Sequence, residues 1–127
     1  MSQREVKYYK LLTKMYELKE KFFGIREDLD EDEGDKAELQ KKQANLNKQI
    51  QEQLIKINKL KEEGKVDKVL KEEMNLKKKE ANIAKLRQRI QNLQKKIEKR
   101  KSGLQKYEVE LRKNESEINL EFPEKMQ

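Results

Sequence analysis

The apolar residues in the second half of the chain recur at a fixed interval of seven. This ladder consists of Val69, Leu76, Ile83, Ile90, Ile97, Leu104, Leu111 and Ile118. A sustained seven-residue repeat keeps one seam of a helix facing a partner helix. The pattern therefore predicts a coiled-coil helix over residues 68–120.

The first half carries a heptad pattern in its own phase. Its apolar positions are Tyr8, Leu11, Met15, Leu18, Phe22, Ile25 and Leu29, followed after an acidic gap by Leu39, Leu46, Ile50, Ile57 and Leu60. This pattern predicts a first helical arm over residues 3–62. The phase does not run on into the second ladder, because Ile57 and Val69 are twelve residues apart rather than fourteen.

The phase break coincides with a turn signal. Gly64 suits a helix C-terminus because glycine adopts positive φ at little cost, and Asp67 is a candidate N-cap for the next helix. We therefore expect a turn at 63–67 and a short tail at 121–127. Residues 1–127 are expected to form a single elongated coiled-coil module.

Two arms of similar length on either side of the turn favour an antiparallel hairpin. When facing residues sum to 129, Leu60 lies opposite Val69 and Leu46 opposite Ile83. In the same register the acidic segment 26–38 lies beside the basic segment 91–103. The predicted fold is thus an all-α, long antiparallel coiled-coil helical hairpin. The alternative is a parallel coiled-coil homodimer in which the Gly64 break is only a stutter.

One local signal opposes an unbroken first arm. Asp35 and Glu38 have the spacing of a capping box, and Gly34 precedes them. They predict a possible break at 30–35. Gly24 and Gly103 fall at a similar level of the hairpin, where glycine weakens a helix interior.

Composition argues against catalysis and cofactor binding. The chain has no histidine, cysteine or tryptophan, which removes the usual general base, the thiol nucleophile and the common zinc ligands. The acidic run from Asp28 does not fit a calcium loop, since its glycine falls at position 7 and Leu39 occupies the position of the bidentate glutamate. We expect no enzyme activity, no cofactor and no metal site.

Targeting signals are weak. The first residues lack the apolar segment of a signal peptide, and no apolar run is long enough to cross a bilayer. The expected location is therefore intracellular, in the cytoplasm or the nucleus, with no transmembrane segment.

An aromatic stripe lies beside the seam of the first arm. Tyr9, Tyr16 and Phe23 recur every seven residues, one step off the seam, with Leu12 beside them. A two-helix hairpin cannot bury a second apolar stripe, and an uncovered stripe of this kind is typical of a contact with another chain. These four residues are the candidate partner-binding residues. Another protein, a second copy of the chain, or partial exposure to water are the alternatives.

A second candidate surface is basic. Between Leu76 and Lys106 there are twelve lysine or arginine residues and two acids, and the net charge of the whole chain is +7. The basic residues off the seam are Lys77, Lys78, Lys85, Arg87, Arg89, Lys95, Lys96, Lys99 and Lys101. Such a stripe suits nucleic-acid phosphates or an acidic filament such as a microtubule, although a solvated face has a similar appearance.

The sequence contains no motif that ties it to a family. It favours a structural or adaptor subunit that docks into a larger protein assembly of other, helical subunits through its aromatic face. The alternative is a basic coiled coil that binds nucleic acid or an acidic filament through residues 77–106. Neither pattern identifies the partner.

Overall fold

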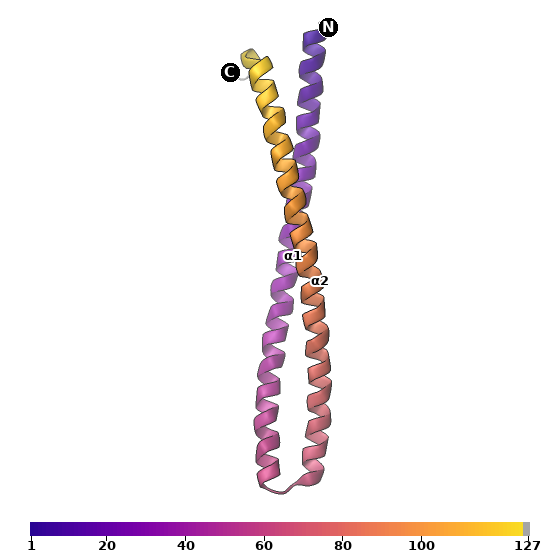
Figure 1. The fold of residues 1–127 in the computed structure, drawn as a ribbon, viewed down its shortest axis with the longest axis vertical. Helices are drawn as coiled ribbons and strands as arrows, with labels where there is room; N and C mark the ends of the chain where they lie inside the picture. The colour runs from indigo at the N-terminus through magenta and orange to yellow at the C-terminus, as the bar shows by residue number, and fades with distance from the viewer. Residues whose placement is uncertain (126–127) are drawn as a thin grey trace. The chain divides into compact units, whose positions relative to one another are not determined.

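A computed structural model describes residues 1–125 of the chain as an all-α helical hairpin (Figure 1). Helix α1 spans Gln3–Glu62, helix α2 spans Val66–Glu121, and a short 3₁₀ helix, η1, spans Pro123–Lys125. Helices α1 and α2 of one chain bury each other's apolar seams. The predicted hairpin is therefore confirmed in preference to the parallel homodimer.

The turn between the helices is built on Gly64. This glycine has φ of 70°, a conformation that residues with a side chain rarely adopt. Gly64 N–H donates to Lys61 O, and Lys65 N–H donates to Leu60 O, each at 3.1 Å. The two bonds form a Schellman motif, which satisfies the last carbonyl groups of α1 and reverses the chain.

The N-cap predicted at Asp67 is wrong. Helix α2 begins at Val66, and Val69 N–H donates to Lys65 O at 3.0 Å. Lys65 therefore occupies the cap position, and Asp67 lies inside the first turn. Its carboxylate remains favourable there because it lies near the positive end of the helix dipole.

The break predicted at 30–35 is also absent, since α1 is continuous through these residues. Leu29, Asp32 and Leu39 are all buried, so contacts made by the helical conformation extend on both sides of Gly34. These contacts outweigh the local preference of Asp35 and Glu38 for a helix start, because tertiary packing supplies more free energy than a single cap.

The chain divides into two compact units. The turn unit comprises Glu33–Lys95, and the terminal unit comprises Met1–Asp32 together with the described part of Lys96–Gln127. The core of the turn unit is one cluster formed by Ile50, Ile57, Val69, Leu76 and Ile83, with Leu46 and Leu60 packed against it. This cluster contains both members of the predicted layers Leu60–Val69 and Leu46–Ile83.

The terminal unit pairs the start of α1 with the end of α2. Lys7 Nζ lies 2.7 Å from Glu121 Oε2, and Asn114 Nδ2 donates to Leu11 O at 3.3 Å. A Cβ added to Gly103 would lie 3.7 Å from Ile25 Cδ1. These contacts run antiparallel, and both α1 and α2 stay helical through Gly24 and Gly103.

Phe122 anchors the described part of the predicted tail through an aromatic contact. Phe122 is only 2% exposed, and its ring meets that of Tyr8 edge to face at 5.3 Å between centroids. The Arg4 guanidinium lies 5.1 Å from the Phe122 ring centroid. Residues 126–127 of the predicted tail 121–127 lie outside the described residues.

Candidate functional site

The aromatic stripe lies on the terminal unit and is exposed. Tyr9, Tyr16 and Phe23 are 52%, 61% and 53% exposed, although each directly follows a seam residue that points toward the partner helix. One step along a helix rotates the side chain by about 100°. The seam residues therefore point toward the partner helix, whereas the next residue in each case, Tyr9, Tyr16 or Phe23, lies on the surface.

Two of the three exposed rings rest on a seam neighbour. Tyr9 meets Tyr8 edge to face with ring centroids 5.4 Å apart, and Phe23 meets Phe22 at 5.5 Å. Tyr8 itself packs on the buried Phe122. Edge-to-face contacts of this kind restrict ring motion, so the exposed rings of Tyr9 and Phe23 are held in place by their neighbours.

The surroundings of the stripe differ from the sequence-based prediction in two respects. Leu12 is half-buried and contributes less exposed surface than the three rings, while Val6, which the prediction omitted, is exposed. An open groove lies at the Tyr9 end of the stripe. It is lined by Met1, Val6, Tyr9, Lys10, Thr13, Lys14 and Glu17. The position of Val6, three residues before Tyr9, was the available signal for extending the stripe.

A further pair of exposed apolar residues lies on α2 in the same unit. Val109 and Leu120 are exposed and border a second open groove. The sequence-based prediction missed them because neither belongs to a heptad ladder and they are not four or seven residues apart. Their distance from one another along α2 makes them a less regular surface than the aromatic stripe.

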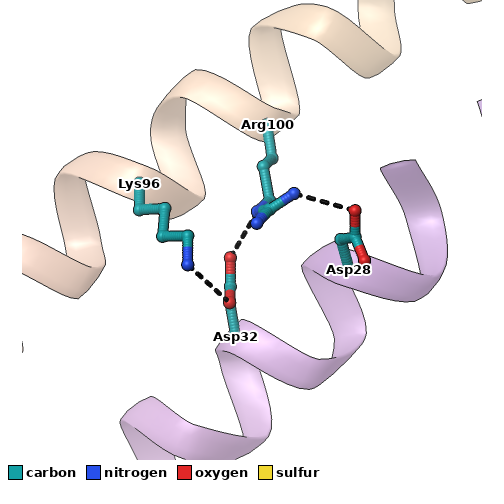
Figure 2. Close-up of polar contacts among 4 residues, drawn as sticks. All are labelled: Asp28, Asp32, Lys96 and Arg100. Atoms are coloured by element: carbon teal, nitrogen blue, oxygen red, sulfur yellow. Dashed lines mark hydrogen bonds and ion pairs between the residues drawn. The ribbon is translucent and has the colours of Figure 1, made fainter. Parts of the chain in front are cut away.

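An ionic cluster connects the acidic and basic segments of the terminal unit (Figure 2). Arg100 donates from Nε to Asp32 Oδ2 at 2.5 Å and from a terminal nitrogen to Asp28 Oδ2 at 3.0 Å. Lys96 Nζ lies 3.9 Å from Asp32 Oδ1. The predicted pairing of opposite charge blocks is confirmed here, where Asp28 and Asp32 of α1 contact Lys96 and Arg100 of α2.

The basic surface is divided between the two units. Lys96, Lys99 and Lys101 lie in the terminal unit, where Lys96 pairs with Asp32 and Lys101 also has a polar partner. The remaining six predicted residues, from Lys77 to Lys95, lie in the turn unit. Within this group Lys77 pairs with Glu80 at 3.4 Å, whereas the other five form no ion pair with any described residue.

The net charge follows the same division. The turn unit contains 17 lysine and arginine residues and 10 acids, while the terminal unit contains 15 of each. The whole excess of +7 therefore resides in the turn unit. A sequence scan of α2 alone missed part of this surface, because Lys41, Lys42 and Lys48 add to it from α1.

The shifted pKa values belong to polar contacts between the two helices or within the turn, rather than to the aromatic stripe or the basic surface. The pKa of Glu72 is lowered by hydrogen bonds from Gln53 and Lys56, and that of Glu63 by Lys65. The pKa of Lys7 is raised by its hydrogen bond to Glu121. Each of these partnerships favours the charged form, which suits a structural ion pair.

None of the described helices combines the length and the apolar character needed to cross a membrane.

Comparisons with known proteins identified no relative of this chain. No protein-family model matches the chain, and searches of curated proteins and of solved structures found no significant match. The geometry and charge of the two surfaces are therefore the basis on which a function is assigned.

Proposed function

We propose that this protein is a non-enzymatic structural or adaptor subunit that docks into a larger protein assembly through the aromatic face of α1. The observation that carries the proposal is the regular line of Tyr9, Tyr16 and Phe23, each more than half exposed. Aromatic residues are the most frequent energetic anchors of protein interfaces. The hairpin holds these anchors on a helix, which fixes their spacing.

The proposed occupant is an amphipathic helix of another protein. Residues seven apart lie about 10.5 Å apart along a helix, and a heptad-patterned partner presents apolar side chains at the same interval. The polar residues beside the stripe, such as Lys10, Lys14 and Glu17, would form the rim. An apolar centre with a polar rim is the usual composition of a non-obligate interface.

The size of the stripe sets the strength of this contact. Half-exposed aromatic rings leave about 100 Å² of apolar surface each, or roughly 300 Å² for the three rings. Burying this area contributes about 7 kcal/mol before the cost of association. That cost is of similar size, so the stripe alone supports a modest affinity and stable docking requires additional contacts.

The test is a triple variant, Tyr9→Ser, Tyr16→Ser and Phe23→Ser. Its matched control, Ile55→Ser, Leu70→Ser and Met74→Ser, removes three exposed apolar residues from the turn unit. Both variants and the wild type would be used for affinity capture with nuclease present, at low and high salt, after circular dichroism has established equal helicity. We expect the stripe variant alone to lose its protein partners, and expect those partners to survive high salt because apolar contacts are not screened.

Three other outcomes would contradict the proposal. Equal partner sets in all three proteins would remove the stripe from the interface. Loss of helicity in the stripe variant would show that the rings are part of the fold. A concentration-dependent doubling of mass in the purified wild type, abolished by the stripe substitutions, would assign the stripe to a second copy of the chain.

A further inference from the structure

The turn unit contains a surface from which acidic residues are absent. Residues 39–51 of α1 and 81–95 of α2 hold no aspartate or glutamate. We call the exposed surface of these two segments the basic belt. Its basic residues are Lys41, Lys42, Lys48, Lys85, Arg87, Arg89 and Lys95. Its remaining polar residues are glutamines and asparagines, so every charge on the belt has the same sign.

The two segments of the belt lie side by side within the turn unit. Leu46 and Ile50 of the first segment belong to the same core cluster as Ile83 of the second. Lys36 Nζ also donates to Gln94 Oε1, which joins the helices at the end of the belt farther from the turn. The acid-free segments therefore form one surface rather than two separate ones.

The basic side chains of the belt are available to a ligand. All seven are exposed, and none forms an ion pair with a residue that the structure describes. The contrast with the adjoining terminal unit is direct, because Lys96 and Arg100 are paired with Asp28 and Asp32 there. In the terminal unit the basic residues are thus neutralised by acids of the same chain, whereas the seven basic residues of the belt form no such pair with a described residue.

The belt has an ordered stripe of hydrogen-bond donors on α2. Asn82, Lys85, Arg89 and Asn92 follow one another at intervals of three and four, which places them on a single face of the helix. Lysine, arginine and asparagine side chains are all common donors to phosphate oxygens. The face repeats about every 10.5 Å along α2.

The composition of the belt distinguishes among three kinds of anionic partner: single-stranded nucleic acid, a lipid surface and duplex nucleic acid. It contains no aromatic residue, so it lacks the stacking platforms on which single-stranded bases bind. The exposed large apolar residues of the turn unit all lie outside its two segments, so it lacks the apolar face with which basic helices enter lipid. The phosphate backbone of a duplex needs neither feature, since its contacts are charge and donor contacts.

We propose that the basic belt binds the phosphate backbone of double-stranded nucleic acid without reading its sequence. The belt shares no residue with the aromatic stripe of the terminal unit, so the duplex-binding proposal and the docking proposal can be tested and refuted independently. Binding by five or so phosphate contacts would depend on salt with a logarithmic slope of about −4.5, which amounts to roughly a 500-fold loss of affinity between 50 and 200 mM salt.

The experiment measures fluorescence anisotropy of a labelled DNA duplex of mixed sequence, about 30 base pairs long, titrated with the full-length chain across this salt range. The test variant changes Lys42, Lys85, Arg87 and Arg89 to glutamine. The control variant changes Lys10, Lys14, Lys106 and Lys113 to glutamine; these are exposed residues of the terminal unit. Both variants lose four charges, so only the location of the loss differs.

We expect the belt variant to bind at least tenfold more weakly than the control variant at about 100 mM salt, with a shallower salt slope. Thermal melting by circular dichroism should be the same for both variants, because all the substituted side chains are exposed. Equal weakening in both variants would overturn the belt in favour of net charge alone. Failure of the wild type to bind duplex even at low salt, or tighter binding to poly-glutamate than to the duplex, would overturn the proposed ligand.

Discussion

Arg100 of α2 donates its Nε–H to Asp32 of α1 over 2.5 Å, and the aspartate that accepts this bond is only 5% exposed. A buried carboxylate is costly unless it is paired and hydrogen-bonded. Asp32 is supplied with two cations, Arg100 and Lys96 (Figure 2). Arg100 and Lys96 therefore compensate the buried carboxylate of Asp32 within a seam that is otherwise largely apolar.

Replacing Arg100 with methionine should destabilise the hairpin by about 1–3 kcal/mol, because the buried Asp32 would lose its closest cationic partner. The expected loss lies below the usual value for a buried pair because Lys96 remains and the Arg100 side chain is 27% exposed. Urea denaturation followed by circular dichroism measures the change in the free energy of unfolding.

The double variant Asp32→Leu, Arg100→Leu is the control for this prediction. It should recover most of the lost stability, since apolar residues at these two seam positions need no charge compensation. Asp28→Asn should have little effect because Asp28 is more than half exposed. A double variant as unstable as the Arg100 single variant would show that the pair supplies more than charge satisfaction.

Asn114 should lower the stability of the hairpin while restricting its register. The residue is 4% exposed, and its Oδ1 has no hydrogen-bond partner among the residues that the structure describes, although its Nδ2 donates to Leu11 O. Asn114→Leu should therefore raise the free energy of unfolding by roughly 1 kcal/mol, because an unsatisfied buried oxygen is removed. Thermal melting tests this, and a decrease in stability would mean that the bond to Leu11 outweighs the orphaned oxygen.

Replacing glycine with alanine should have opposite effects on stability in the interior of α1 and in the turn. A Cβ at Gly24 or Gly34 would meet no atom within 4 Å, and neither residue has positive φ. Each change to alanine should stabilise the protein by about 0.5–1 kcal/mol, since alanine loses less backbone entropy in a helix. Gly64→Ala is the opposing control: φ of +70° should make it destabilising by about 1 kcal/mol. Stabilisation by all three changes would contradict the turn geometry.

Glu72 should make the turn unit sensitive to acid. Its pKa is lowered because Gln53 Nε2 donates to Oε2 at 3.0 Å and Lys56 Nζ donates to Oε1 at 3.1 Å. A carboxylate with a lowered pKa contributes stability above its unfolded pKa and loses it as the pH falls through the folded pKa. The contribution of Glu72 should thus disappear at acidic pH, below the usual titration range of glutamate.

Carboxyl NMR titration of Glu72 measures this effect. Gln53→Leu should move the pKa of Glu72 back toward its ordinary value, because the largest cause of the shift is removed. Lys56→Met should do so to a smaller degree. An unchanged pKa in the Gln53 variant would show that this amide does not hold the carboxylate in solution.

The heptad pattern by itself determined the helical hairpin. Residues such as Ile83 and Ile97 occupy a seam that must leave water, and the complementary seam lies on the other half of the same chain. Gly64 then allows the chain to reverse between them. Periodicity and the hydrophobic effect are sufficient here, because burial of a regular stripe depends only on spacing and polarity. The exposed positions of Tyr9, Tyr16 and Phe23 follow from the same periodicity.

Only the tertiary structure decided which local signals prevail and which charges are neutralised. The capping signal at Asp35 and Glu38 yields to the packing of Leu29, Asp32 and Leu39, since contacts between helices contribute more free energy than one cap. The ring of Phe122 contacts the ring of Tyr8, although the two residues are more than a hundred positions apart in the sequence. The basic surface is divided because Asp28 and Asp32 pair with Lys96 and Arg100, whereas Lys85 and Arg89 form no ion pair with an acid among residues 1–125. Such pairings depend on which side chains meet across the two helices, and that is a property of three-dimensional register rather than of composition or periodicity.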